Sequence, residues 1–596
     1  MVNVNNKIGI FNLLKYVAIK YGNKQKLILV FSFLVMILAG ISEIFSIISV
    51  VPFLTIVTDP GRISEIYFAE KLINFLGLNS TNQILIFLAL LLILASTFTT
   101  FIKLLNIWIN GKLAANIACK IAAEGYYRTL HQSYEKHLYS KSSNTIDGYT
   151  TQVTRICDSL RDSLQIISSS IVGFSIVLIL FIVDFYLAFI ATTIIFLFYL
   201  FFAYKIRKKL VANSKIAAES SKLIVKNLQE SLGGIKDLIL GNYQKYYLDL
   251  FKKNHKPLRE KDMESLYLSQ FPKYMFETIS IFTIAIFAIL LSNYESGSEI
   301  IVKLGVFALA SQKLIPYFQL TYASWARLKA SSKQVQSVLY RANQSVDIPS
   351  DIEQSKVKKF ELKSKIEIKN LRFSYKESNN ILENISFEIN KGDRIGLIGS
   401  TGSGKSTLID IIMGLLPPSS GEILIDKKNL YSSENKDFIL KWWKSISFVP
   451  QNIFLSDRTI AENIAFGINN SEIDFELVEK VAKVSQLNSF LSKTKNGLQT
   501  SVGERGLRIS GGQMQRLGIA RALYNQNKIL ILDEATSALD TKTEKLLMHS
   551  INNLDKDITI VMVTHRLSTL NNCNKIINIK SGRVDFIDDT SKFEYN

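Results

Sequence analysis

Cysteine is scarce in this sequence: 596 residues contain three, Cys119, Cys157 and Cys573. They lie far apart along the chain and in no spacing typical of a metal site. This scarcity excludes a fold that is held together by disulfides, as in small secreted scaffolds. We interpret the three residues as isolated thiols in the core or on the surface.

Acidic residues are also few relative to basic ones. There are 51 Asp and Glu against 70 Lys and Arg, which gives a formal charge of +19. Such an excess can indicate nucleic-acid binding. Here much of it lies in loops beside apolar segments, where positive charge follows the cytoplasmic side of a membrane. We therefore expect a membrane protein with no nucleic-acid partner.

Long apolar runs fill the first half of the chain. A helix needs ~20 apolar residues to cross the hydrocarbon core of a bilayer. Six runs approach this length, at 27–57, 83–101, 164–183, 186–204, 274–291 and 300–317. The first is too long for a signal peptide, and we expect it to be retained as a transmembrane helix. The sixth is weak because it carries Lys303 and Lys313, but the topology requires an even number of spans.

The distribution of positive charge predicts that topology. Segments 103–161 and 205–273 are dense in Lys and Arg, whereas the loops 59–82 and 293–299 carry few positive residues. The basic segments and the N-terminus are therefore expected in the cytoplasm. Since both basic segments have helical patterning, we predict that they are long cytoplasmic extensions of helices two to five.

The pattern changes to that of an α/β protein in the second half. Residues 365–373 alternate between apolar and polar side chains, as a half-buried strand does. Short apolar strands are predicted at 395–398, 529–532 and 558–563, with helical patterns between them. This alternation predicts a largely parallel sheet with helices packed on it.

A glycine-rich stretch, Gly399-Ser-Thr-Gly-Ser-Gly-Lys405-Ser406, follows the predicted strand 394–398 and precedes the helical run 407–416. Glycines allow backbone N–H groups to surround phosphates without side-chain clashes. Lys405 would reach the β- and γ-phosphates, and Ser406 would ligate Mg²⁺. The strand–loop–helix context favours a phosphate-binding loop over a plain turn.

Two carboxylates end another apolar strand, in the sequence Ile529-Leu-Ile-Leu-Asp533-Glu534. Asp533 would hold Mg²⁺ through water, and Glu534 would polarise the attacking water. Together with the phosphate loop, this pair predicts ATP hydrolysis. The predicted fold class is a polytopic α-helical membrane domain with six transmembrane helices, followed by a C-terminal α/β P-loop ATPase domain.

The stretch Ile509-Ser510-Gly511-Gly512-Gln513 resembles the signature of the ABC (ATP-binding cassette) ATPases, an element that other P-loop classes lack. The family usually begins it with Leu; Ile preserves the bulk and leaves the Ser-Gly-Gly donors intact. The resemblance implies a half-transporter of the type IV exporter class. Its expected domains are a transmembrane domain at 1–330, a linker at 331–364 and an ABC nucleotide-binding domain at 365–596.

The resemblance covers the whole second half and implies roles for matching positions. Tyr375 matches the aromatic residue that stacks on adenine, Gln451 the glutamine that senses the γ-phosphate, and His565 the switch histidine. The implied catalytic residues are Glu534, His565 and Gln451, and the implied Mg²⁺ ligands are Ser406, Gln451 and Asp533. The residues implied to bind ATP are Tyr375, Gly399, Ser400, Thr401, Gly402, Ser403, Gly404, Lys405, Ser406, Thr407, Ser510, Gly511, Gly512, Gln513 and Asp533.

The family resemblance also implies a homodimer. In ABC exporters, the phosphate loop of one subunit and the signature of the other enclose the same ATP. Loops 502–506 and 537–540 match the elements that touch the intracellular helices and bridge the subunits. With one ATPase domain and six spans, two copies of this chain would form two intact sites for ATP and Mg²⁺.

Three stretches of the membrane half, at 40–53, 233–241 and 304–319, resemble one exporter subgroup, the bacterial flippases of lipid-linked oligosaccharides. Residues 66–78 predict an amphipathic helix at the lipid interface. In that subgroup such a helix engages a polyprenyl tail; the alternative is a loop helix without a ligand. The implied partners are membrane lipids and the lipid-linked glycan. The implied location is the bacterial cytoplasmic (inner) membrane, with the ATPase domain in the cytoplasm.

Such a cargo would require basic residues in or near the spans. A polyprenyl pyrophosphate has an anionic headgroup that needs a hydrated, basic route. Lys273, Lys303 and Lys313 are the candidate cargo residues. Snorkelling explains Lys273, Lys303 and also Lys103, but it explains Lys313 less well. Glu43 lies within the first span, and we expect it to be a packed partner of a basic residue.

Other functions are also compatible with this sequence. An exporter of this class could instead move lipid A, drugs, peptides or other amphipathic molecules. A drug pump more often lines its cavity with aromatic residues than with lysines. A different class of function is an ATP-gated regulator or channel, which the intact Glu534 disfavours.

Overall fold

The structure is a computed structural model that describes residues 20, 26–58, 80–291, 297–349, 357–375, 380–432, 436–570 and 573–589. Contacts divide the chain into two compact units. The first comprises Met1–Gln132 and Tyr139–Asp347, and the second comprises Ser133–Leu138 and Ile348–Asn596. The predicted outer-loop helix at 66–78 lies outside the described residues. The predicted domain bounds at 330 and 364 stay a prediction.

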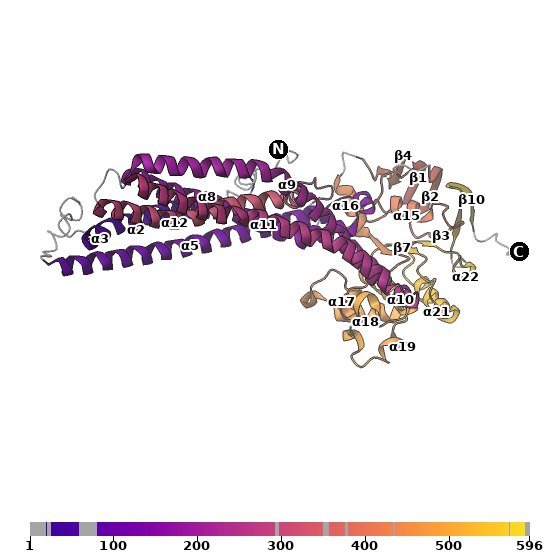
Figure 1. Ribbon diagram of the computed structural model, residues 1–596. Helices are drawn as coiled ribbons and strands as arrows, with labels where there is room; N and C mark the ends of the chain where they lie inside the picture. The colour runs from indigo at the N-terminus through magenta and orange to yellow at the C-terminus, as the bar shows by residue number, and fades with distance from the viewer. Residues whose placement is uncertain are drawn as a thin grey trace. The chain divides into compact units, whose positions relative to one another are not determined.

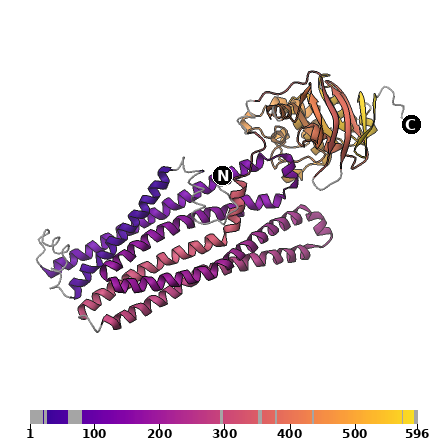
Figure 2. The same ribbon diagram turned by 90° about the horizontal axis from the view of Figure 1, so that it is seen from above.

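The first unit is a bundle of long α-helices that run side by side (Figures 1 and 2). Its described helices are α2 (Lys26–Ile48), α3 (Val50–Thr58), α5 (Thr81–Leu130), α7 (Ser142–Tyr149), α8 (Thr151–Val183), α9 (Phe185–Gly233), α10 (Ile235–Leu240), α11 (Gln244–Leu291), α12 (Gly297–Ala330) and α13 (Ser332–Arg341). Helix α6 (Tyr134–Tyr139) lies mostly in the second unit.

Three of these helices are far longer than a membrane requires. Helices α5, α9 and α11 have 50, 49 and 48 residues. At 1.5 Å per residue, each measures ~70–75 Å, more than twice the ~30 Å of a hydrocarbon core. Helices with short breaks between them fill the basic segments 103–161 and 205–273, which confirms their predicted helical patterning.

Side-chain caps fix two of the turns in the bundle. Ser80 precedes α5 and accepts a hydrogen bond from Gln83 N at 3.3 Å. Asp184 precedes α9 and accepts one from Leu187 N at 3.1 Å. Such caps satisfy backbone donors that a helix start leaves free. Asp184 is also the single residue between α8 and α9, so the connection between these two helices is very short.

Five of the described helical segments are long and apolar enough to cross a membrane. The sixth predicted span lies within α12, which does not reach that threshold; its lysines 303 and 313 lower its hydropathy, as expected. Helix α12 nevertheless packs along α8 and α11. Its Ala310 is fully buried and Leu314 is nearly so. The sixth helix is therefore an integral part of the bundle.

The second unit contains two sheets. Their strands are drawn as arrows in Figure 2. The larger has the strand order β10-β9-β3-β8-β7-β6. Its strands are β3 (Arg394–Ile398), β6 (Ile446–Val449), β7 (Ile529–Asp533), β8 (Thr559–Val563), β9 (Lys575–Lys580) and β10 (Arg583–Asp589). All neighbours are parallel except β9 and β10. Strands β7 and β8 are buried at every residue, as expected when helices cover both faces.

The smaller sheet is antiparallel, with the order β2-β1-β4-β5. Its strands are β1 (Lys365–Phe373), β2 (Leu382–Asn390), β4 (Ser420–Ile425) and β5 (Lys428–Asn429). The expectation of one largely parallel sheet was thus incomplete, because strand 365–373 belongs to this second sheet. Its alternating pattern is typical of an antiparallel strand with one face on the core.

Helices surround the two sheets. They are α15 (Lys405–Ile412), α16 (Lys436–Ser445), α17 (Ile460–Ile464), α18 (Phe475–Val484), α19 (Asn488–Leu491), α20 (Gly511–Tyr524), α21 (Thr541–Asn552) and α22 (Leu567–Leu570). One hydrophobic cluster joins α15 to strands of both sheets. A separate cluster joins α17, α18 and α20. The helical part between β6 and β7 therefore has its own small core.

Candidate functional site

The glycine-rich loop connects β3 to α15 and requires its glycines. Gly399, Gly402 and Gly404 have φ values of +147°, +82° and +101°, which L-residues rarely adopt. A Cβ on Gly404 would lie 2.6 Å from Leu382 Cδ2. Any side chain at these positions would therefore be strained, and the loop presents mainly backbone to its surroundings.

Lys405 begins α15, and its side chain folds back over the loop. Its Nζ donates to the carbonyl oxygens of Gly399 at 2.8 Å and Ser400 at 2.9 Å. Burial lowers the pKa of Lys405, while the nearby carboxylates Glu534 and Asp533 act to raise it. The loop thus holds a cation within a ring of backbone groups, which is the arrangement that suits a polyphosphate.

Asp533 ends β7 and lies beside Ser406. Burial and the neighbouring Glu534 raise the pKa of Asp533, whereas a hydrogen bond with the Ser406 side chain lowers it. The described residues contain no group of three or more His, Cys, Asp and Glu able to hold a metal on its own. One hydroxyl and one carboxylate fit Mg²⁺ that arrives with phosphate oxygens and keeps its waters.

Glu534 is the meeting point of three strand ends. Gln451 follows β6 and donates from Nε2 to Glu534 Oε2 at 2.7 Å. His565 follows β8 and places its Nε2 2.9 Å from Glu534 Oε1. The carboxyl ends of parallel strands meet at one edge of a sheet, which brings these residues together. Glu534 itself has a φ of +48°, an uncommon conformation for a glutamate that is typical of functional sites.

The signature segment begins α20. Ser510 and Gln513 form a reciprocal capping box, in which the side chain of each residue accepts from the backbone N–H of the other. Gly511 and Gly512 lie against Ala538. Gln515 accepts from the backbone N–H of Ala538 at 2.8 Å. The signature and loop 537–540 are therefore fixed to each other.

Tyr375 lies after β1 and near the start of α15. Its ring is perpendicular to that of Phe373, with 5.0 Å between centroids. Its hydroxyl is 3.4 Å from Thr407 Oγ1. A neighbouring carboxyl, Asp410, was not predicted from the sequence: burial and the charge of Asp533 raise its pKa to about 6. Asp410 is a charged residue among apolar ones in the helix after the phosphate loop, and this position could have predicted that its carboxyl is buried.

In the first unit, a cavity of about 480 Å³ contains a buried ion-pair triad. Glu43 of α2 is fully buried. Its Oε2 is 2.6 Å from Lys103 Nζ of α5, and its Oε1 is 3.2 Å from Lys313 Nζ of α12. Lys313 also donates to Ser46 Oγ at 2.8 Å. The triad carries a net positive charge, since two ammonium groups share one carboxylate.

Other polar groups line the same cavity. Among them are Asn106, Gln165, Ser168, Gln312 and Tyr317. Asn106 donates to Ser168 Oγ at 2.5 Å. The Lys103 ammonium lies 5.4 Å from the centroid of the Tyr317 ring. Lys103 was expected to snorkel, but it faces this cavity. Its position near the end of a span did not indicate which way its side chain would point.

The other two candidate cargo lysines lie elsewhere. Lys273 is 4.0 Å from Glu277 one helical turn away, and both are partly exposed. Lys303 is 3.6 Å from Asp184, the residue between α8 and α9. Neither lines the cavity that contains Lys313. Of the three predicted cargo lysines, the structure thus brings only Lys313 into the cavity, together with Lys103.

Two protein-family models match this sequence. Residues 382–537 match a model described as ABC transporter, and residues 29–302 match the ABC transporter transmembrane region. Together the two matches cover more than half of the chain and extend over both units. This chain belongs to the ABC transporter family.

Curated relatives of this ABC transporter include the leukotoxin translocation ATP-binding protein LktB of Mannheimia haemolytica and that of Bibersteinia trehalosi. Each is 37% identical to it over 278 residues, which are 46% of this chain and 38% of the relative. The chain thus spans well under half the length of these relatives. A solved structure of a bacterial Atm1-family ABC exporter with ATP bound aligns over 95% of both chains, with a TM-score of 0.77 and 20% identity. This likeness shows the fold.

These matches confirm the predicted fold class of the transporter, a helical membrane domain followed by a nucleotide-binding domain. They also confirm that it is a multi-pass membrane protein with an ATPase domain of the ABC class. The oligosaccharide-flippase subgroup, the homodimer and the roles of single residues stay predictions.

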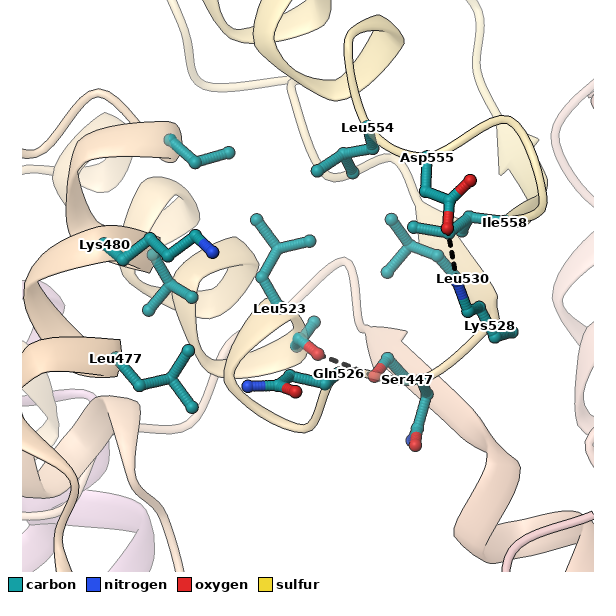
Figure 3. Close-up of a pocket in the computed structure, with 14 residues that line it drawn as sticks. Ser447, Leu477, Lys480, Leu523, Gln526, Lys528, Leu530, Leu554, Asp555 and Ile558 are labelled. Atoms are coloured by element: carbon teal, nitrogen blue, oxygen red, sulfur yellow. Dashed lines mark hydrogen bonds and ion pairs between the residues drawn. The ribbon is translucent and has the colours of Figure 1, made fainter.

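A further cleft of about 400 Å³ in the nucleotide-binding unit contains none of the predicted site residues. Figure 3 shows Leu477 and Lys480 of α18 facing Leu523, with Asp555 paired to Lys528 on the far wall. Its lining is largely apolar and its ion pair is satisfied internally. It separates α18 from the sheet edge and has no evident part in nucleotide chemistry.

Proposed function

We propose that this ABC transporter is an ATP-driven exporter that works as a homodimer and moves a lipid-linked oligosaccharide across the bacterial cytoplasmic membrane. The observation that carries the ATP-driven part is the convergence of Gln451 and His565 on the two oxygens of Glu534. The observation that carries the cargo is the net positive triad of Lys103, Glu43 and Lys313 in a membrane cavity.

In this proposal Glu534 is the base that polarises the attacking water. Gln451 and His565 hold its carboxylate and contact the γ-phosphate. Lys405 would release its two loop carbonyls and bind the β- and γ-phosphates. Mg²⁺, held by Ser406, Asp533 and Gln451, would neutralise phosphate charge.

The homodimer is proposed because the signature needs a nucleotide from a second copy. Ser510 and the N–H groups at the start of α20 form a helix N-terminus, which favours a phosphate. In ABC exporters the partner's phosphate loop supplies it. ATP would then favour the closed dimer, because it contacts both subunits only in that state.

The cargo proposal rests on the chemistry of the cavity. A pyrophosphate headgroup is costly to move through hydrocarbon, and cationic side chains compensate that cost. The triad retains one net positive charge, and about a third of each lysine side chain is exposed. The amide and hydroxyl groups of Asn106, Gln165 and Ser168 would form hydrogen bonds with a glycan entering the cavity.

The test uses purified transporter in proteoliposomes that contain a fluorescent lipid-linked oligosaccharide, with enzymatic access to the glycan as readout. The intact protein is expected to move the lipid with ATP, and Glu534→Gln is expected to abolish transport while still binding ATP. Lys313→Gln should reduce transport but keep basal ATPase activity, because Lys103 still neutralises Glu43. Lys273→Gln is the matched control and should behave as the intact protein.

ATPase activity without any transport of the glycolipid would overturn the cargo and keep the ATP-driven exporter. Export of a toxin is then the second candidate, favoured by the similarity to leukotoxin translocation ATP-binding proteins. Glycolipid movement that persists in Glu534→Gln would contradict coupling to hydrolysis.

A further inference from the structure

A second cavity of the membrane unit, of about 540 Å³, lies where α9 meets the junction of α12 and α13. We call it the basic pocket. It shares no residue with the cavity around Glu43. Its lining includes four cations, Arg207, Lys208, Lys329 and Lys333, together with Tyr204 and Val211. Its size lies within the range of ~300–1,000 Å³ that is usual for ligand pockets.

Helical spacing places these side chains on two facing surfaces. On α9, Tyr204, Lys208 and Val211 are four and three residues apart, so they share one helix face. Lys329 and Lys333 are also four residues apart, and only Ser331 separates α12 from α13. The two helical segments therefore direct cations into one hollow.

None of the four cations of the basic pocket is neutralised within the described residues. No carboxylate there lies within 4.0 Å of Arg207, Lys208, Lys329 or Lys333. Their neighbour Lys209 differs, because it lies 2.5 Å from Glu264. Four uncompensated positive charges repel one another, and an anion would relieve that repulsion.

The pKa of Lys329 reflects this uncompensated charge. Lys329 lies well beyond the predicted sixth span, which ends at residue 317. Burial lowers the pKa of Lys329, and the positive charge of Arg207 lowers it further. An ion pair would have had the opposite effect. The pocket therefore contains a partly buried cation whose nearest charged influence is another cation.

Tyr204 indicates where the basic pocket lies relative to the membrane surface. This residue ends the predicted fourth span, and 82% of its surface is exposed. Exposed tyrosines at span ends typically lie at the level of lipid headgroups. Arg207 and Lys208 follow within one turn, in the basic segment that the charge distribution assigns to the cytoplasm. Val211 adds an exposed apolar surface beside them.

We propose that the basic pocket binds the phosphate or pyrophosphate headgroup of a lipid from the cytoplasmic leaflet. Basic pockets between helices at this level are suited to anionic lipid headgroups. The exposed Tyr204 and Val211 favour a lipid over a soluble anion, since they offer contact to acyl or prenyl chains. The inference stands without the proposed cargo, because bilayer phospholipids have the same chemistry.

The test measures lipid binding to the purified full-length transporter in a neutral detergent by native mass spectrometry. The probes are phosphatidylglycerol, phosphatidylcholine, a polyprenyl pyrophosphate and sodium pyrophosphate. The variant is Arg207→Gln with Lys333→Gln, and the matched control is Lys209→Gln, which removes a cation already paired with Glu264. Basal ATPase activity reports that each variant is folded.

Phosphatidylglycerol is expected to bind more tightly than phosphatidylcholine, and more weakly as salt increases. The double variant should bind it about thirtyfold more weakly, since each cation near a membrane surface contributes ~1 kcal/mol. The Lys209→Gln protein should bind as the intact protein does. Competition by polyprenyl pyrophosphate would support the site and identify the cargo as its ligand; lack of such competition would identify a bilayer phospholipid.

Three results would overturn the proposal. They are equal binding of phosphatidylcholine, unchanged phosphatidylglycerol binding in the folded double variant, and displacement of the lipid by sodium pyrophosphate at a similar concentration. Failure of glycolipid transport in proteoliposomes would not bear on it. The lipid site and the transported cargo are thus tested separately.

Discussion

Replacement of Glu43 by glutamine is the sharpest perturbation of the membrane unit. The change keeps the shape of the side chain but removes the charge that two lysines share. Glu43 is fully buried, and its oxygens lie 2.6 Å and 3.2 Å from Lys103 and Lys313. Breaking a buried ion pair by removing one partner usually costs ~3–5 kcal/mol.

The expected cost here is somewhat below that range. About a third of each lysine side chain is exposed to the cavity, so solvent screens the two ammonium groups that the substitution leaves behind. We expect Glu43→Gln to lower the free energy of unfolding by about 2–3 kcal/mol. Because the entropy of unfolding grows with chain length, the apparent Tm of a chain of this size should fall by about 2 °C.

The assay is thermal unfolding of the purified transporter in detergent at a fixed heating rate, followed by intrinsic fluorescence. Glu277→Gln is the control, because Glu277 forms a partly exposed pair with Lys273 at 4.0 Å. Such pairs contribute ~0.5 kcal/mol or less. Lys313→Met should have an intermediate effect, since Lys103 still neutralises Glu43. If Glu43→Gln costs no more than Glu277→Gln, the triad does not stabilise the bundle and the reasoning is wrong.

Three further predictions concern the nucleotide-binding unit. Asp410 has a pKa of about 6 in the folded protein instead of 3.8, so the folded state keeps a proton that the unfolded state releases, and stability falls as pH rises from about 4 to 6. Asp410→Asn should therefore raise the free energy of unfolding at pH 7.5 by about 1–2 kcal/mol after allowance for solvent screening, which a higher apparent Tm would report. At pH 4 the substitution should give no gain. Gly404→Ala should abolish nucleotide binding in a fluorescent-ATP titration, because φ is +101° and the new Cβ would meet Leu382 at 2.6 Å; unchanged affinity would contradict this. Glu544→Gln should lower the free energy of unfolding by about 2–3 kcal/mol in the same thermal assay, because the buried carboxylate accepts hydrogen bonds from Thr536, Thr569 and Arg566. A loss below about 0.5 kcal/mol would contradict this prediction.

Sequence alone determined the local motifs of the nucleotide-binding unit, although not its second sheet. The phosphate loop, the Asp533–Glu534 pair and the signature are local patterns, and each depends on a turn or a strand end that neighbouring residues encode. Glycine at 399, 402 and 404 is required by backbone angles that few other residues adopt. The helices of the membrane unit were likewise evident, because long apolar runs have few alternatives in a bilayer.

Tertiary structure decided what contacts what across long sequence separations. The convergence of Gln451 and His565 on Glu534 depends on the strand order β8-β7-β6, which no local pattern specifies. Lys103 and Lys313 meet at Glu43 only because α2, α5 and α12 pack together, although 210 residues separate the two lysines. The basic pocket arises in the same way, from α9 and the junction of α12 and α13. Charge in a sequence indicates which side chains are costly to bury, but only packing decides whether each is paired, as Lys209 is, or left for a ligand, as Arg207 is.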